Sequence, residues 1–403
     1  MFLFFFVCTI IKTQAEIIHV YPAGSLKHAL SEAAKGDTVL VHGGYYYEHD
    51  LEITKELTFL GENYPVIDGE GQYHILTVSS DKVSILGFNF CNSGISFITE
   101  NAAVKLSGVK GCTLSGNRFT NNFFAIYLAN STECRITNNR IESNSERETY
   151  SGNGIHLWYC TNIVIENNII RGHRDGIYME FVEGTEIADN LSEKNLRYGL
   201  HFMFSNSCDY KRNTFRENGA GVAVMYTQAV VMTENHFEQN LGPASYGLLL
   251  KEIRDSHIEY NFFENNSVGL YAESSNRLIV RQNVFAENGW AVKIMANSMD
   301  NRFTGNDFLG NAFDVATNSR QNFNTFDANY WHRYRGYDLD GDGTGDVPFR
   351  PVRLFSLIAE NEHTALVLLN SFFVDLLDLA ESVFPSIVPE TLIDNNPKMK
   401  RIL

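Results

Sequence analysis

Residues 261–288, NFFENNSVGLYAESSNRLIVRQNVFAEN, contain the block Asn-x-Phe-x-x-Asn twice, first from Asn261 and again from Asn283. The same block recurs along much of the chain, with a spacing of about 22 residues. Its other copies begin at Asn117, Asn213, Asn235, Asn306 and Asn324, and weaker copies, in which Ile or Ser replaces Phe, begin at Asn139, Asn168 and Asn190. A repeat of this length predicts a solenoid, in which each unit buries its apolar side chains against its neighbours.

A short apolar strand that starts at Gly precedes many of these blocks. Six such strands begin 14 residues before the first Asn of a block, at Gly154, Gly176, Gly199, Gly221, Gly247 and Gly269. Stacked coils about 4.8 Å apart would pair each strand with its equivalents above and below. Phe would then stack on Phe inside, and Asn amides would bond one another along the corners. We therefore predict an all-β fold, a right-handed, single-stranded parallel β-helix of roughly ten to twelve coils over residues 37–330.

The two ends of the chain follow other patterns. Residues 16–36 should form an N-terminal strand and a capping helix, in which Ser25 caps the helix and Gly36 ends it. From residue 354 the apolar spacing becomes helical, which predicts a C-terminal amphipathic helical tail over residues 354–403. Its apolar side offers a docking surface for a membrane subunit, with packing onto the solenoid end as the alternative; the candidate residues are Leu368, Phe372, Phe373 and Leu376.

Composition and the N-terminus bear on location and partners. A formal charge of −16 leaves no footprint for nucleic acid. Residues 2–11 are apolar and are followed by Thr13, Gln14 and Ala15, which predicts a signal peptide over residues 1–15 and export to the periplasm. The five remaining cysteines contain no C-x-x-C, which argues against a thiolate metal site. Cys112 and Cys134 fall in one inward column, where paired thiols or a disulfide are both open.

Strand alternation places the candidate binding face. Two longer coils, with extra residues at 145–152 and 241–246, bracket the four strands that start at Gly154, Gly176, Gly199 and Gly221. The second and fourth residues of these strands should point outward. This face therefore presents His201, Met203 and Met225 together with a partner-binding set, namely His156, Trp158, Tyr178 and Glu180.

Thioether and imidazole groups suit Cu(I). Met203 and Met225 should lie in one column of adjacent coils, with His201 two residues from Met203 on the same face. We predict a transient copper site at these three residues. Exposed Met and aromatic side chains also make adaptable protein interfaces, so a patch that grips a partner is the other interpretation.

The segment after the repeats is acidic and rich in Gly. Four carboxylates alternate along it and can converge on one hard cation: Asp338, Asp340, Asp342 and Asp346. This matches the first half of a calcium loop, although Phe349 stands where an EF-hand has its bidentate Glu. We predict a structural Ca²⁺ loop within residues 331–353. An acidic turn without metal is the alternative.

The C-terminal part of the chain carries a family resemblance. The sequence around Asn329-Tyr-Trp331, the segment from Tyr337 through Asp346-Val-Pro-Phe-Arg350, and the late Asp394-Asn-Asn-Pro-Lys-Met399 resemble the NosD family. That resemblance implies a periplasmic, copper-binding maturation factor for nitrous oxide reductase, peripherally associated with the inner membrane. The partners that it implies are the membrane and ATPase subunits of an ABC transporter, apo-nitrous oxide reductase and a copper-chaperone lipoprotein.

Sugar-processing enzymes offer the main alternative function, because lyases, hydrolases and epimerases share this scaffold. Glycoside hydrolysis needs two carboxylates beside the scissile bond. The predicted face offers Glu180 centrally, with Asp175 and Glu183 near corners, so we expect no enzyme activity. A carbohydrate-binding solenoid would need an aromatic groove along many coils, and the alternation leaves only three outward aromatics, which are Trp158, Tyr178 and Tyr271.

Overall fold

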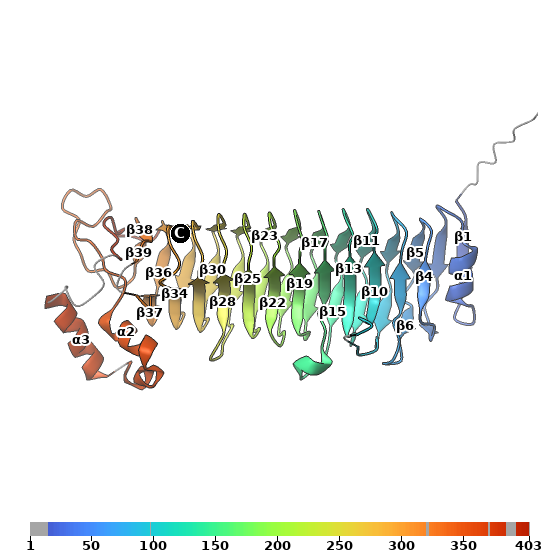
Figure 1. Ribbon diagram of the computed structural model, residues 1–403, viewed down its shortest axis with the longest axis horizontal. Coiled ribbons are helices and arrows are strands. Elements are labelled where there is room, and N and C mark those ends of the chain that lie inside the picture. The colour runs from blue at the N-terminus through green and yellow to red at the C-terminus, as the bar shows by residue number, and fades with distance from the viewer. Residues whose placement is uncertain (1–14, 97, 320–321, 370, 384–391, 403) are drawn as a thin grey trace, which may run out of the picture.

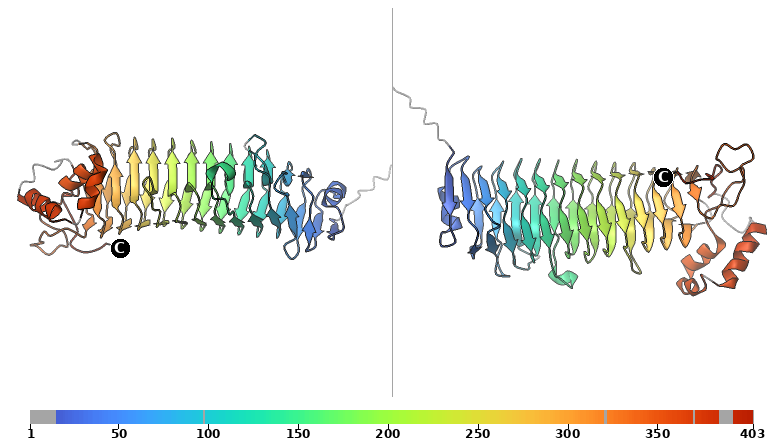
Figure 2. Two further views of the ribbon diagram at one scale, coloured as in Figure 1. Left: turned by 90° about the horizontal axis from the view of Figure 1, so that it is seen from below. Right: turned by 180° about the vertical axis from the view of Figure 1, so that it is seen from behind.

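The computed structural model describes residues 15–96, 98–319, 322–369, 371–383 and 392–402, so the predicted signal peptide lies almost wholly outside the described residues. The chain forms a long right-handed parallel β-helix with three sheets, which we call sheets A, B and C (Figures 1 and 2). Each coil visits A, then B, then C. The predicted fold is confirmed, although sheet A has 14 strands and the helix is longer than the roughly ten to twelve coils expected.

All pairings within the three sheets are parallel. Sheet A contains β1 (Ile17–Val20), β2 (Thr38–Val41), β5 (Thr58–Gly61), β8 (Ser84–Leu86), β11 (Thr113–Ser115), β14 (Arg135–Thr137), β17 (Val164–Glu166), β20 (Glu186–Ala188), β23 (Asp209–Lys211), β26 (Val231–Thr233), β29 (His257–Glu259), β32 (Ile279–Arg281), β35 (Arg302–Thr304) and β38 (Thr325–Asp327). Sheet B contains β3 (Tyr45–Tyr46), β6 (Val66–Asp68), β9 (Asn89–Cys91), β12 (Arg118–Thr120), β15 (Arg140–Glu142), β18 (Ile169–Arg171), β21 (Leu191–Glu193), β24 (Thr214–Arg216), β27 (His236–Glu238), β30 (Phe262–Glu264), β33 (Val284–Ala286), β36 (Asp307–Leu309) and β39 (Tyr330–Trp331). Sheet C contains β4 (Leu51–Ile53), β7 (Leu76–Val78), β10 (Ala102–Ser107), β13 (Phe124–Ala129), β16 (Ile155–Trp158), β19 (Asp175–Glu180), β22 (Tyr198–Met203), β25 (Ala220–Met225), β28 (Tyr246–Lys251), β31 (Val268–Glu273), β34 (Trp290–Ile294) and β37 (Phe313–Ala316).

The repeated Phe and Asn residues do what their period predicts. Phe237, Phe263 and Phe285 are fully buried, and their rings stack at 4.6 and 4.7 Å between centroids. In the ladder formed by the first Asn of each block, Nδ2 of Asn261 donates to Oδ1 of Asn283 (3.0 Å). The backbone N–H of Asn261 donates to the same oxygen (2.9 Å). Each Asn thus satisfies backbone and side-chain groups that a corner would otherwise bury without a partner.

Three insertions project from one edge of the solenoid, where sheet B passes to sheet C (Figure 1). The predicted insertions at 145–152 and 241–246 both lie at this edge, and the first contains a 3₁₀ turn, η1 (Glu148–Tyr150). A third, at 93–101, was missed. It lengthens its coil to 29 residues, because the N–H of Phe88 donates to Oδ1 of Asn117, whereas the equivalent bond from Asn117 to Asn139 spans 22 residues.

The N-terminal cap forms as predicted. Helix α1 (Leu26–Glu32) begins after Ser25, whose hydroxyl accepts a hydrogen bond from the N–H of His28 (3.2 Å). The carboxylate of Glu48 accepts further bonds from the N–H groups of Leu26 and Lys27. The apolar side of the helix is buried against the first coils, which closes this end of the core.

The C-terminal tail differs from the single helical segment expected. It contains helix α2 (Leu354–Asn361), the 3₁₀ turn η2 (His363–Leu368) and helix α3 (Phe372–Val383). Residues 392–402 are not helical. They return to the end of the solenoid, where Asp394 bridges to Phe326 and Lys398 bridges to Tyr330 in parallel. Within the described residues, no helix is long and apolar enough to cross a membrane.

Candidate functional site

Strands β16, β19, β22 and β25 place two outward columns on sheet C. The inward residues of these strands are fully buried, as the alternation predicts. The register aligns one column as His156, Tyr178, His201 and Ala223, and the next as Trp158, Glu180, Met203 and Met225. The structure therefore brings the predicted copper candidates and the predicted partner-binding residues onto one face.

Met203 and Met225 are register partners in adjacent strands, with half-buried side chains on the outer face. Adjacent strands lie about 4.8 Å apart, so two thioethers in one column can approach a single soft cation. Glu180 precedes Met203 in the same column and accepts a hydrogen bond from Oη of Tyr178 (3.3 Å). This column thus presents soft sulfur ligands beside a carboxylate.

His201 is more deeply buried than a surface ligand would be, with 5% of its side chain exposed. The rings of Tyr178 and Tyr198 cover it, at 5.1 and 4.7 Å between centroids. Its Nε2 is buried and has no hydrogen-bond partner, which is a costly arrangement for a polar atom. An unsatisfied ring nitrogen on the face that also presents two thioethers fits the donor types of a soft metal.

Asp175 lies beside this histidine, and it is itself fully buried with no hydrogen-bond partner for either oxygen. One of its oxygens lies 3.5 Å from Nδ1 of His201, and the other lies 3.3 Å from Nε of Arg197. Nη2 of Arg197 also lies 3.3 Å from Nδ1 of His201. The two contacts at Nδ1 select opposite tautomers: donation to Asp175 leaves Nε2 with a free lone pair, whereas acceptance from Arg197 places the proton on Nε2. Metal binding through Nε2 requires the first.

His156 occupies a separate environment, because Tyr178 stands between it and His201 in the column. Burial lowers the pKa of His156 to about 4, so its ring is neutral at neutral pH. Its Nδ1 lies 2.9 Å from Nδ2 of Asn153, and its ring stacks on Tyr127 at 4.5 Å. The structure thus does not bring His156 to the copper candidates.

The outward column continues as a polar network that the sequence did not indicate. Oη of Tyr127 donates to Glu100 (2.8 Å), whose other oxygen pairs with Nζ of Lys105 (3.1 Å). Burial works to raise the pKa of Glu100, but the bonds from Lys105 and Tyr127 outweigh it and the pKa is lowered. Glu100 is the second-last residue of the 93–101 insertion, so this loop contacts the end of the outward column that lies before His156.

The expectation of only three outward aromatics was wrong. Four further aromatic side chains, which we call the aromatic ladder, lie one residue beyond the Trp158–Met225 column, at Tyr159, Phe181, Phe204 and Tyr226. Their rings stack from coil to coil at 4.6, 5.3 and 5.0 Å between centroids. They occupy a corner with positive φ, where strict strand alternation does not apply, and this is why the sequence pattern missed them.

The acidic loop gathers three of its four predicted ligands. One carboxylate oxygen from each of Asp338, Asp340 and Asp342 lies within 4.8 Å of the others, whereas Asp346 is not in this group. Its carboxylate instead accepts a bond from the N–H of Leu339 (2.7 Å). Bonds from backbone N–H groups, led by that of Gly343, lower the pKa of Asp338, so the loop holds a negative cluster at neutral pH.

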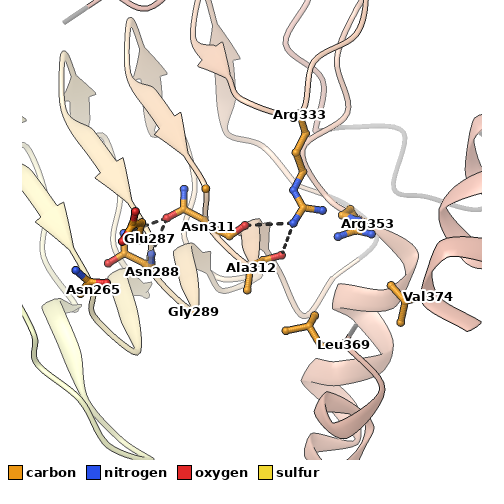
Figure 3. A pocket seen from close by; sticks show the side chains of 11 residues that line it. Asn265, Glu287, Asn288, Gly289, Asn311, Ala312, Arg333, Arg353, Leu369 and Val374 are labelled. Carbon is orange, nitrogen blue, oxygen red and sulfur yellow. Dashed lines mark hydrogen bonds between the residues drawn. The ribbon is translucent and has the colours of Figure 1, made fainter. Parts of the chain in front are cut away.

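Helices α2 and α3 pack on the last coils through one side and leave the other exposed. Phe355 and Val374 are buried against Trp290 and Phe313. The predicted docking residues lie on the exposed side, at Leu368, Phe372, Phe373 and Leu376. A pocket of about 780 Å³ lies between the helices and the coils (Figure 3), where Nη2 of Arg333 donates to the carbonyls of Asn311 and Ala312 (both 3.3 Å).

Comparison with known proteins relates this geometry to a family. A family model described as "Periplasmic copper-binding protein (NosD)" matches residues 144–336. Proteins named "Probable ABC transporter binding protein NosD" from Pseudomonas aeruginosa and Stutzerimonas stutzeri are 28% and 27% identical to this chain, and each alignment covers 88% of it and 86% and 85% of the relative.

Solved structures share the architecture at low identity. A Yersinia enterocolitica family 28 exopolygalacturonase has a TM-score of 0.64 at 10% identity and covers 78% of each chain. PfbA, a surface adhesin of Streptococcus pneumoniae, has a TM-score of 0.57 at 13% identity and covers 76% of this chain and 88% of its own. Likeness at this level shows the fold alone. The family model that matches across the candidate face and the near full-length relatives show that the chain is similar to NosD proteins over most of its length.

Proposed function

We propose that this chain is a periplasmic accessory protein that acts with an ABC transporter in copper-site assembly, and that its client is nitrous oxide reductase. The family is described as periplasmic and copper-binding, and its relatives are named as ABC transporter binding proteins. In this role copper is cargo. Apo-nitrous oxide reductase would receive it, a copper-chaperone lipoprotein would supply it, and the membrane and ATPase subunits of the transporter would anchor the process.

The observation that carries the proposal is that the two methionines and the buried histidine lie on the same face of sheet C. Met203 and Met225 are register partners, and His201 on the same strand has a buried Nε2 without a partner. These residues would hold Cu(I) in transit, because thioethers and a neutral imidazole bind it without the thiolates that make copper hard to release. Asp175 would hold His201 in the tautomer that frees Nε2.

A non-catalytic role is part of this proposal. Glu180 is the central carboxylate of the face, and it is bonded to Tyr178. Asp175 is buried in ion pairs with Arg197 and Arg174, at 3.3 and 4.0 Å. Because Asp175 is fully buried, only Glu180 of these two could contact a substrate, whereas glycoside hydrolysis needs a pair of carboxylates beside the scissile bond.

The test is titration of the purified mature chain with Cu(I) against a competing chromophoric chelator. We expect stoichiometric binding that the His201→Ala/Met203→Ala/Met225→Ala variant loses. The matched control is Met299→Ala/His236→Ala, which removes an exposed methionine and an exposed histidine away from the face. Equal binding by all three proteins would refute this site, and no binding by any would leave the face as a grip for the client or chaperone.

Two further parts of the proposal concern the C-terminal region. We propose that Asp338, Asp340 and Asp342 bind a structural Ca²⁺, and that Phe372 and its exposed neighbours dock on the membrane subunit. Phe372 is 79% exposed, which is unusual for a side chain of this size. Replacing Phe372 and Phe373 with Ser should abolish co-purification with the transporter and leave copper binding unchanged. Retained co-purification would refute the docking surface.

A further inference from the structure

The aromatic ladder is not required by the fold. It lies at the corner that leads out of sheet C, where all four residues have φ between 49° and 57°. Other coils have Gly108, Asn130, Glu252 and Ser274 at the same corner, also with positive φ. Gly and Asn accept this conformation readily, whereas a bulky residue there costs roughly 1–2 kcal/mol. Four successive aromatics at such a position therefore mark a function rather than a folding need.

The ladder points to solvent. Tyr159 is 49% exposed, and Phe181, Phe204 and Tyr226 are 39%, 40% and 38% exposed. The side chains of Trp158, Met203 and Met225 border it along one side, because they occupy the adjacent residue of the same coils. Ladder and methionine column together form an apolar surface over four coils that only Glu180 interrupts, which is larger than scattered surface apolar residues explain.

The stacking decides which chemistry this surface presents. Interplanar angles of 21°, 10° and 15° make neighbouring rings nearly parallel, so each ring covers the face of the next. A sugar binds aromatic residues through an open ring face, and within the stack only the outer faces of Tyr159 and Tyr226 are not covered by another ladder ring. Ring edges remain exposed, and they carry the positive part of the aromatic quadrupole. Thioether sulfur commonly contacts aromatic rings at the edge, so methionine side chains suit this surface.

The charges beside the ladder favour a partner with positive charge. Glu183 is exposed two residues after Phe181 in the same coil, and Glu252 follows Tyr226 at the corner of the next coil. Among the nearby cations, Lys251 pairs with Glu273 (3.9 Å), whereas Nε of Arg254 donates to the neutral Gln228 (2.9 Å) and keeps its charge, so Glu183 and Glu252 outnumber the one cation without an acidic partner among these residues. The surface is thus negative at its edges, in a chain whose formal charge is −16.

The end of the ladder opens into a pocket. Tyr226, Gln228 and Arg254 line a hollow of about 520 Å³, where no fifth aromatic continues the stack. The three ring separations extend over roughly 15 Å, the length of about five extended residues. A short extended segment could therefore lie along the ladder and place one side chain in the pocket.

We propose that the aromatic ladder binds a segment of a partner protein that carries methionine and basic residues. The proposal rests on the proposed function and deepens it, because a segment bound here lies beside the Met203–Met225 column and is positioned to exchange Cu(I) with it. Ring edges contact the partner's thioethers, and Glu183 and Glu252 attract its lysines. The metal is not needed for this recognition.

Fluorescence anisotropy tests the proposal on the full mature chain, in buffer that contains a copper chelator. The probes are labelled peptides of about eight residues, which alternate Met with Lys, Met with Glu, or Ser with Lys. We expect the Met/Lys peptide to bind at least about tenfold more tightly than the other two, because each of them lacks one of the two contacts.

Three variants separate recognition from folding. Phe181→Asn/Phe204→Asn removes two rings but retains a residue that accepts positive φ, as Asn130 does in another coil. It should weaken Met/Lys binding about tenfold or more. The control Tyr260→Asn removes an exposed aromatic with φ 57° at another corner and should change nothing. A Glu183→Gln/Glu252→Gln variant, which does not alter the corner, should weaken binding several-fold and reduce its salt dependence.

Three results would overturn the inference. They are no binding of the Met/Lys peptide, equal binding by the ring variant, or ladder-dependent binding of a neutral oligosaccharide in place of the peptide. Copper titration of the ring variant keeps the two proposals apart, because its copper ligands are untouched. Lost peptide binding with intact copper binding supports the ladder alone. Intact peptide binding in a chain that binds no copper contradicts only the copper site.

Discussion

Asp394 ends the asparagine ladder that runs from Asn117 to Asn329, and it does so from the distant C-terminus. Oδ2 of Asp394 accepts hydrogen bonds from the backbone N–H of Asn329 (3.0 Å), from Nδ2 of Asn329 (3.1 Å) and from Nε1 of Trp331 (2.9 Å). Its Oδ1 accepts bonds from the N–H groups of Ala328 and Asn396 (both 3.1 Å). Asp394 is fully buried, so these bonds replace water completely.

Replacing Asp394 with Ala should destabilise the last coils strongly. Three N–H donors of Asn329 and Trp331 would lose their acceptor in a buried position, and each unsatisfied donor costs about 1–3 kcal/mol. Because bonds that share one oxygen are not additive, we expect a loss of roughly 3–5 kcal/mol. Asp394→Asn should cost about 2–3 kcal/mol, since one oxygen remains but the amide then faces N–H groups that also donate.

Hydrogen exchange measured by mass spectrometry resolves this loss along the chain. Each coil of a solenoid contacts only its neighbours, so the effect should be concentrated in residues 322–335 and fade toward the middle coils. A loss of 3 kcal/mol corresponds to exchange about 100-fold faster. The control is Asp327→Asn, because Asp327 bonds Nδ2 of Asn396 at an exposed site. Unchanged exchange in Asp394→Ala, or equal effects in both variants, would refute this account of the ladder's end.

The remaining predictions concern pH, calcium and copper. Burial lowers the pKa of His173 to about 4, and both its ring nitrogens lack hydrogen-bond partners. The unfolded chain therefore takes up a proton between pH 7 and pH 5, whereas the folded chain does not. This difference should lower the free energy of unfolding by about 1–2 kcal/mol from pH 7 to pH 5. His173→Asn should remove part of this acid sensitivity in thermal melts, and an unchanged pH profile would contradict the assignment. Chelator should lower the melting temperature of the wild-type chain but not that of Asp338→Asn; no shift in the wild type would exclude the structural Ca²⁺. Asp175→Asn should weaken Cu(I) binding about 10- to 100-fold while His201 stays in place, and unchanged affinity would show that Asp175 does not set the tautomer.

Much of the fold follows from the sequence because a parallel β-helix repeats one local rule. A coil of about 22 residues has one inward Phe and two corner Asn residues, and stacking turns each into a column. The inward and outward assignments in β16, β19, β22 and β25 are correct for the same reason, since strand alternation is a local property. The capping helix was also predictable, because Ser25 and the apolar spacing after it act within a few residues.

The candidate site was predictable only in part. Alternation places Met203 and Met225 on the outer face, but it does not say what covers that face. His201 is buried by Tyr178 and Asp175 from the preceding coil and by Tyr198 on its own strand. The aromatic ladder lies at corners with positive φ, where neither the strand period nor the helix period holds.

The sequence by itself determined the period of this protein, its inward residues and its N-terminal cap, because each depends on contacts between residues close in the chain or one repeat apart. The tertiary structure decided the burial of His201, the stacking of the aromatic ladder and the return of Asp394 to Asn329. The physical reason is separation along the chain. Asp394 reaches a partner 65 residues away, across two helices that follow no repeat, and no local pattern encodes such a contact.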